Sequence, residues 1–357
     1  MSHIDYHMPI TLGIIVRDES RIIQRCLDRV KDHITDWVII DTGSTDNTKA
    51  LVRESLEGIP GKILDRPWVD FGFNRSELVV EAQHYVLDTL GEGLNTGYLL
   101  LLDADHIFHG DLSGIGEAPG YLIELTGDLQ GYKMPYLVGA DIPWKYLGRT
   151  HEYICADGFD GQYDNIDSCT LEHRGDGGTR HEKFERDLKL LEEDYESDPN
   201  NERTVYYLAQ TLQGMGETER ATELFRRRSQ LGGFDQEAFW AAFQVGECTG
   251  RIEDYVTAWF MRPSRWEPIQ RAMKLLNEQR NYTAVLALAK AATREATDDH
   301  LFVERWVEEY GLAFELCLAL WWTGDIAMAK SGWEDILKVP TLSDGYRQLC
   351  IANLAHC

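Results

Sequence analysis

The 357-residue sequence has no long hydrophobic run, no Cys-x-x-Cys pair and no signal-like start. No apolar stretch approaches the roughly 20 residues that a membrane-spanning helix needs. The first ten residues, MSHIDYHMPI, lack the basic start and apolar core of a signal peptide. The seven cysteines are scattered and odd in number, which is typical of reduced thiols rather than a disulfide framework or zinc site. These absences predict a cytoplasmic protein without a membrane span.

Positive charge is scarce as well. The chain has 35 Lys and Arg against 60 Asp and Glu, a formal net charge of −25. Such a chain repels phosphate backbones, so nucleic acid is not an expected partner. The glycine patterns GxGxxG and GxxxxGK[ST] are also missing, and this argues against dinucleotide-binding and P-loop folds.

The first half of the sequence alternates strand and helix patterns. Four apolar segments predict strands, at residues 10–16, 36–41, 61–68 and 98–102. Amphipathic or capped segments between them predict helices at residues 19–34, 43–56 and 74–90. Strands that alternate with helices form a mostly parallel, doubly wound sheet. We therefore expect a Rossmann-like α/β domain over residues 1–180.

The second half, residues 181–357, reads as helix after helix. Gly216 and Gly250 end comparable helical turns 34 residues apart, the period of tetratricopeptide hairpins. A similar pattern returns around Gly324, whereas residues 277–292 fit the repeat less well. We predict a tetratricopeptide-like domain that is able to mediate homo-oligomerisation; a generic helical bundle is the alternative.

Two strand ends carry polar groups suited to ligand chemistry. In YLLLLDADH, Asp103 and Asp105 follow a leucine strand, and in an extended chain they would share one face. Two carboxylates at a strand end make half a site for a divalent cation. In VIIDTGSTDNT, Asp41 ends a strand and residues 43–46 turn into a helix, so backbone N–H groups there could meet a nucleotide. An ordinary capped turn is the alternative.

Four segments in order, ITLGIIVRDESRIIQRCLDRV, VIIDTGSTDNT, RPWVDFGFNRSE and LLLLDADH, resemble inverting family 2 glycosyltransferases of the GT-A fold. The resemblance spans residues from about 10 to 195 and is strongest to the branch with a tetratricopeptide-like extension. It implies a nucleotide-sugar donor, a UDP-sugar, and Mg²⁺ or Mn²⁺. It places at the donor Val16, Arg17, Glu19, Asp41, Arg75, Asp103, Ala104 and His151. Asp103 and Asp105 match the motif that holds the metal and diphosphate.

The same resemblance suggests a base and a further metal ligand. An inverting transfer needs a base for the acceptor hydroxyl, and Glu152 in GRTHEYI is the expected one; a capping or salt-bridged glutamate is the alternative. Cys155 excludes an HExxH zinc site. His173 is the expected third metal ligand, with a hydrogen-bonding histidine as the alternative. His106 departs from the usual D-A-D-E and is most simply a solvent-facing loop histidine.

The sequence therefore predicts a metal-dependent inverting glycosyltransferase whose hydroxyl acceptor is carried by a protein, a peptide or a glycan. A nucleotidyltransferase is one alternative, but the glycine-rich basic loop that it needs is missing. A repeat scaffold with a decayed enzyme domain is the other. Asp103, Asp105, Glu152 and Arg75 speak against it.

Overall fold

The computed structural model of the chain describes residues 8–90, 96–127, 132–177, 180–292, 299 and 301–356. Two compact units divide the chain, residues 1–190 and 191–357. The division falls inside helix α4 (Arg180–Ser197). The boundary expected from the sequence, between residues 180 and 181, lies at the start of the same helix.

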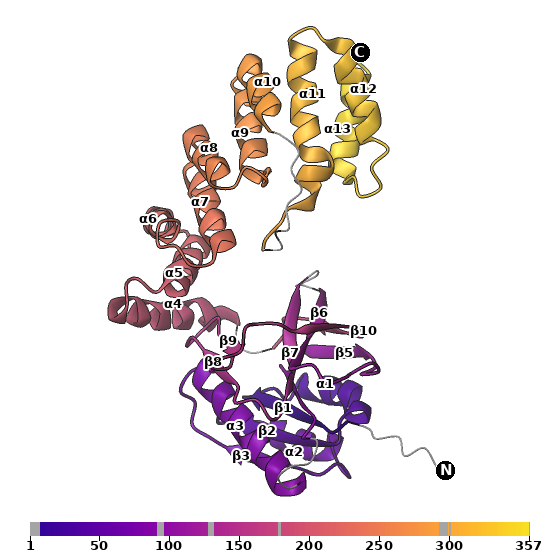
Figure 1. Ribbon diagram of the computed structural model, residues 1–357, viewed down its shortest axis with the longest axis vertical. Helices are drawn as coiled ribbons and strands as arrows, with labels where there is room; N and C mark the ends of the chain where they lie inside the picture. Colours follow the sequence, from indigo (N-terminus) through magenta and orange to yellow (C-terminus); the bar gives the residue numbers. More distant parts are fainter. Residues whose placement is uncertain are drawn as a thin grey trace. The chain divides into compact units, whose positions relative to one another are not determined.

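Unit 1 is built on a sheet with the strand order β3-β2-β1-β4-β7-β6-β10-β5 (Figure 1). β3, β2, β1 and β4 are parallel neighbours, and β6 and β10 are parallel to each other. β7 runs antiparallel to β4 and β6, and β5 runs antiparallel to β10. The mostly parallel α/β fold predicted from the sequence is confirmed. The strands are β1 (Ile10–Val16), β2 (Asp36–Asp41), β3 (Gly61–Asp65), β4 (Tyr98–Leu102), β5 (His106–Gly110), β6 (Gly120–Gly127), β7 (Lys133–Gly139) and β10 (Asp164–His173).

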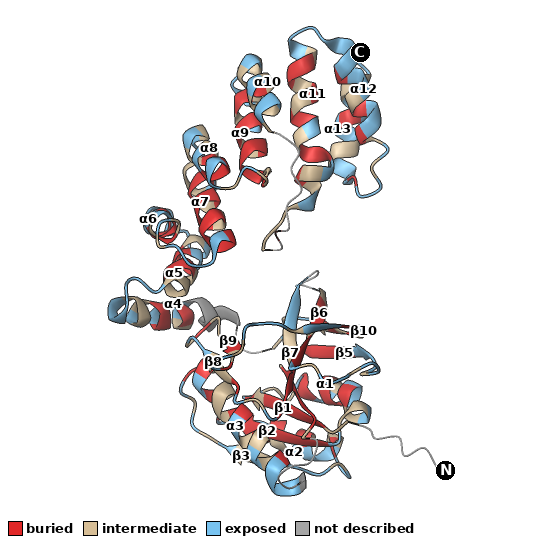
Figure 2. Ribbon diagram, in the orientation of Figure 1, coloured by how far each residue is buried: buried red, intermediate tan, exposed pale blue. Residues whose placement is uncertain are grey.

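Helices cover both faces of this sheet, as the leucine strand β4 makes clear. Leu100 and Leu102 pack in the same core as helices α1 (Ile23–Val30) and α2 (Thr48–Ser55). Leu99 and Leu101 pack in the opposite core with helix α3 (Phe71–Leu90). Successive strand residues point to opposite faces, so a strand buried on both sides is apolar throughout. Figure 2 shows this burial along the central strands.

The remaining small elements of unit 1 are a 3₁₀ turn after α1 (Lys31–His33) and a two-stranded ribbon of β8 (Lys145–Leu147) and β9 (Tyr153–Cys155). Three predicted elements are shorter than expected. The third strand ends at Asp65 rather than at residue 68, the first helix begins at Ile23 rather than at residue 19, and the second helix begins at Thr48 rather than at residue 43.

Unit 2 consists of antiparallel helical hairpins, as the tetratricopeptide-like period predicts. The helices are α5 (Glu202–Gly214), α6 (Thr218–Arg228), α7 (Asp235–Thr249), α8 (Ile252–Met261), α9 (Glu267–Glu278), α10 (Tyr282–Ala291), α11 (Leu312–Trp322), α12 (Ile326–Ile336) and α13 (Asp344–Leu354). A π-helical turn (Val307–Gly311) leads into α11.

The hairpin turns explain why one repeat is hard to recognise in the sequence. Gly216, Gly250 and Gly324 each adopt a positive φ (84°, 64° and 94°), which glycine tolerates best. The α9–α10 hairpin, in the poorly fitting stretch, has Arg280 at φ 59° in the corresponding turn. The helical repeat therefore continues through this hairpin, although arginine replaces the glycine at its turn. No helix among the described residues is long and apolar enough to cross a bilayer.

Candidate active site

A cleft of about 410 Å³ lies in unit 1 at the carboxyl ends of the parallel strands. We call it the aspartate cleft. It is lined by Ile15, Glu19, Phe71, Arg75, Asp103, Ala104, Asp105, Thr150, His151, Glu152, His173, Gly175, Gly177 and Arg186. Open α/β sheets bind ligands outside this end of their strands. The cleft brings together eight predicted site residues that come from distant parts of the sequence.

Three predicted donor-site residues, Val16, Arg17 and Asp41, are not part of the lining. Val16 and Asp41 are buried and pair with each other where β1 and β2 end, and Arg17 is exposed. Asp41 accepts the backbone N–H groups of Gly43 and Ser44 through Oδ1, at 2.9 and 2.7 Å. Its Oδ2 atom is buried without a hydrogen-bond partner.

The turn after Asp41 differs from the expectation. Its backbone donors are already used: Asp41 takes those of Gly43 and Ser44, and Asp18 takes that of Thr45 at 2.7 Å. Helix α2 then begins at Thr48. The turn is therefore stabilised internally and offers fewer N–H groups to a ligand than the sequence suggested. The Oδ2 atom of Asp41 remains as a hydrogen-bond acceptor without a partner.

Asp103 and Asp105 occupy a tight turn rather than an extended strand end. β4 stops at Leu102, and the backbone N–H of His106 donates to the carbonyl of Asp103 over 3.1 Å, which closes the turn. The expected sharing of one strand face is therefore wrong. Both carboxylates still line the cleft, together with Ala104 between them.

Arg75 on α3 connects two carboxylates of the cleft. Its Nη2 atom lies 2.5 Å from Asp103 Oδ1, and its Nε atom lies 2.7 Å from Glu152 Oε1. The side chains of Arg75 and Glu152 are each only 13% exposed. Burial alone would raise the pKa of Asp103, but the nearby guanidinium holds it below its ordinary value. Asp103 is therefore an anion over the whole neutral range.

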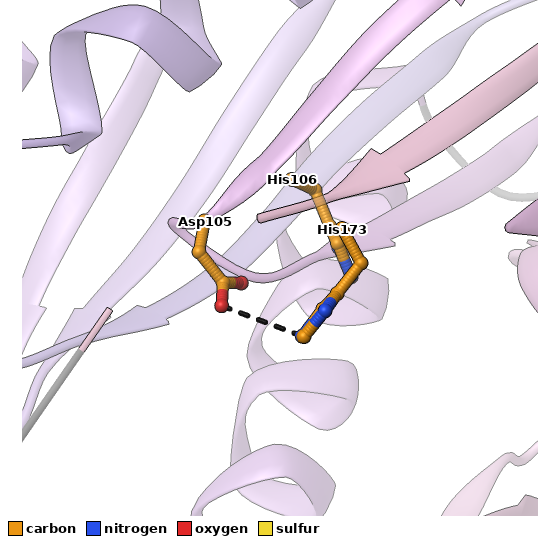
Figure 3. A group of neighbouring side chains, drawn as sticks. All are labelled: Asp105, His106 and His173. Carbon is orange, nitrogen blue, oxygen red and sulfur yellow. Dashed lines mark ion pairs between the residues drawn. The ribbon is translucent and has the colours of Figure 1, made fainter. Parts of the chain in front are cut away.

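Asp105, His106 and His173 form a cluster of metal-ligating side chains (Figure 3). One ligand atom from each lies within 4.8 Å of the others. Asp105 Oδ2 and His173 Nε2 are 3.5 Å apart. Two ligands each about 2.1 Å from one Mg²⁺ ion lie about 3 to 3.5 Å apart, so this pair fits a shared cation. His173 ends β10 and reaches Asp105 because β10 and β5 are paired, with His173 opposite His106.

His106 contradicts the interpretation as a solvent-facing loop residue. It is the first residue of β5 and is 1% exposed. Its Nδ1 atom accepts the backbone N–H of Asp103 over 3.0 Å, and its ring contacts those of Tyr136 and His173 edge-on. Burial lowers the pKa of His106, so the ring is neutral at pH 7.

That hydrogen bond also fixes the tautomer of His106. A ring nitrogen that accepts an N–H has no proton, so the proton of the neutral ring is on Nε2. Neither nitrogen then has a free lone pair for a metal ion. Within the cluster, Asp105 and His173 are the side chains that could hold one.

Glu152 and His151 reach the cleft on a loop packed closely against α3. A Cβ atom on Gly72 would lie 2.1 Å from the carbonyl oxygen of Gly148, so only glycine allows this approach. His151 adopts φ 51°. Of the further lining residues, Phe71 and Arg186 stack, with the guanidinium 4.9 Å from the ring centre. Phe71 lies in the segment RPWVDFGFNRSE quoted above, but neither residue was among the predicted site residues.

Known proteins match only part of the chain in sequence. No protein-family model matches the chain. The glycosyltransferase SunS of Bacillus subtilis is 22% identical over 237 residues, 61% of this chain and 52% of SunS. A tetratricopeptide-repeat protein of Synechococcus elongatus is 35% identical over 98 residues, 27% of this chain and 20% of that protein. The chain thus spans about half of the first relative and a fifth of the second.

Solved structures show weak likenesses. TarS of S. aureus, residues 1–349 in complex with UDP, gives a TM-score of 0.38 at 10% identity over 73% of this chain and 93% of that one. The tetratricopeptide protein YrrB gives 0.36 at 11% identity over 48% and 84%. Both scores are low, and the fold is established by the strand topology described above. By sequence, the chain is similar to the glycosyltransferase SunS over 61% of its length and to a tetratricopeptide-repeat protein over 27%.

Proposed function

We propose that the chain is a metal-dependent, inverting glycosyltransferase that uses a nucleotide-sugar donor, a UDP-sugar. The aspartate cleft carries the proposal: paired aspartates, a histidine, a buried arginine and a glutamate meet at the ligand-binding end of a mostly parallel sheet. The sequence relationship to the glycosyltransferase SunS supports it.

The donor would lie across the carboxyl ends of β1, β2 and β4. The partnerless Oδ2 of Asp41 suits an N–H donor of the nucleotide base. Val16, Arg17 and Glu19 border the same end of β1. Arg75, whose side chain is 13% exposed, would pair with diphosphate oxygens, since a guanidinium matches phosphate geometry. Ala104 and His151 complete the lining on that side.

The metal would be Mg²⁺ or Mn²⁺, held by Asp105 and His173 with Asp103 beside them. The spacing of Asp105 and His173 suits a small divalent cation, and the carboxylate donors fit either ion. When bound, such an ion neutralises charge on the departing diphosphate. His106 would contribute by fixing the backbone of Asp103.

Glu152 is the proposed base for the acceptor hydroxyl. It lines the cleft from the loop after β8. An inverting transfer needs a base of this kind for the acceptor hydroxyl. Its ion pair with Arg75 has to loosen for this role. An anionic diphosphate competes for the same guanidinium, so donor binding would release Glu152. The acceptor hydroxyl is proposed to lie on a protein or peptide, with a glycan as the alternative source.

Calorimetric titration of UDP into the full chain tests the proposal, first with Mn²⁺ and then with excess chelator. We expect binding that chelator weakens at least tenfold and that Asp105→Ala abolishes. Asp88→Ala, an exposed change on α3, is the control and should bind normally. UDP-sugars would then be screened for hydrolysis. Absence of binding to UDP, GDP and CDP would overturn the proposal and favour a repeat scaffold.

A further inference from the structure

Unit 2 contains a cavity of about 590 Å³ that the transferase proposal does not use. Its lining residues come from α9, α10, α11 and α13 and from the N-cap of α13; Figure 1 labels these helices. We call it the α9–α13 pocket. Its lining includes Asn277, Tyr282, Phe314, Glu315, Trp322 and Tyr346. These residues all belong to unit 2, so the inference does not depend on unit 1.

The pocket holds a buried carboxylate that has no ion-pair partner among the described residues. Glu315 is 4% exposed and accepts hydrogen bonds from the side-chain amides of Gln270, at 3.3 Å, and Asn277, at 2.9 Å. Among the described residues, no lysine, arginine or histidine lies within ion-pair distance of it. A buried carboxylate is costly to ionise unless it is paired. Burial accordingly raises the pKa of Glu315.

A second acceptor in the pocket is also unsatisfied. Asn277 donates to Glu315 through its amide nitrogen, which fixes the orientation of the amide. Its Oδ1 atom is buried and has no hydrogen-bond partner. Lys274 and Glu278 lie one helical turn apart at the exposed rim and act on the pKa of Glu315 in opposite directions, since Lys274 lowers it and Glu278 raises it. A ligand that complements the inside of the pocket would therefore supply several N–H donors and one positive charge.

Aromatic rings form the walls. Tyr282 and Trp322 stack in parallel at 5.6 Å, and Tyr346 meets Phe314 edge-on at 5.0 Å. Such rings attract cations, and guanidinium groups stack on them. Trp322 is 57% exposed and Leu349 50%, so apolar surface continues outward at the rim, where it could cover the stem and backbone of a bound chain.

We propose that the α9–α13 pocket binds the guanidinium group of an arginine side chain presented by a polypeptide. A guanidinium supplies five N–H donors in one plane with a permanent positive charge, which matches the carboxylate, the free amide oxygen and the rings together. A neutral group of the same shape would leave Glu315 unpaired.

Fluorescence anisotropy tests the inference with a labelled pentapeptide of one central arginine flanked by glycines. The comparison peptide has citrulline, which keeps the shape but lacks the charge. The full chain is used without any nucleotide sugar, so the result is separate from transferase activity. We expect the arginine peptide to bind at least tenfold more tightly than the citrulline peptide. Glu315→Gln should remove most of that difference.

Controls distinguish the outcomes. Glu334→Gln, an exposed change on α12 outside the pocket, should leave binding unchanged. Thermal unfolding should show that Glu315→Gln is at least as stable as the parent chain. Equal binding of the two peptides, no binding at all, or no effect of Glu315→Gln would overturn the inference. Free arginine amide and the unlabelled peptide would also be compared as competitors. If arginine amide displaces the labelled peptide at the same or a lower concentration, the polypeptide part of the inference is overturned.

Discussion

The Nδ1 atom of His106 accepts the backbone N–H of Asp103, so a buried ring supports the turn that carries both aspartates. The bond leaves Nδ1 without a free lone pair and the Nε2 proton in place. His106 therefore supports the proposed metal site without being able to join it, whereas His173 is able to act as a ligand.

This difference predicts unequal effects on metal affinity. His173→Asn should weaken Mn²⁺ binding about a hundredfold, because it removes a ligand. His106→Asn should cost about tenfold, at the lower end of the losses that supporting residues of metal sites cause. Electron paramagnetic resonance of free Mn²⁺ measures both. Equal losses for the two variants would show that His106 changes its tautomer and coordinates the ion.

The shared position of Arg75 predicts a pH-dependent coupling with Asp103. Because the folded-state pKa of Asp103 is lowered, the stabilisation is present above the unfolded value of about 3.9 and is lost as the pH falls through the folded value. In a double-mutant cycle of Arg75→Met and Asp103→Asn, urea unfolding should give a coupling of about 2 kcal/mol at pH 7. It should decline only below about pH 4. A coupling that does not change with pH would contradict the ion pair.

Glu315 predicts the opposite pH behaviour in unit 2. Its folded-state pKa is raised by burial, so its contribution to stability is present below the unfolded value of about 4.3 and is lost as the pH rises through the folded value. Glu315→Gln should therefore be more stable than the parent chain by about 1 kcal/mol at pH 8. Denaturant unfolding at several pH values should show this gap closing toward pH 4. A constant gap would mean that Glu315 titrates normally.

Gly72 controls the position of the loop that carries Glu152. Gly72→Ala places a methyl group against the Gly148 carbonyl and should lower the free energy of unfolding by about 2 kcal/mol. It should also slow sugar transfer by displacing Glu152. Gly345→Ala on α13 is the matched control, since its Cβ meets nothing within 4 Å, and it should raise stability by up to about 1 kcal/mol. Thermal unfolding and single-turnover rates measure both changes, and full activity of Gly72→Ala would show that the loop tolerates the shift.

Local patterns in the sequence were sufficient for the α/β core and for the aspartate pair. Leu99 and Leu100 are buried on opposite faces of the sheet because they belong to an apolar strand between two layers of helices. The burial of His106 could not be predicted, because it depends on β5 pairing with β10 more than 60 residues later. Long-range pairing of this kind leaves no local periodicity. Glu152 is salt-bridged in the structure, which was the alternative considered for it, and its partner is Arg75. The sequence could not identify this partner, because it associates Arg75 only with the donor.

The guanidinium of Arg75, placed between two carboxylates, also constrains how this protein can change over evolutionary time. If position 75 loses its positive charge, Asp103 and Glu152 are left facing each other as unpaired, largely enclosed anions. Relatives that have lost the arginine should therefore have replaced at least one of those acids as well. We expect positions 75, 103 and 152 to covary as a triplet, so a relative's residue at position 75 would indicate whether its cleft retains this chemistry.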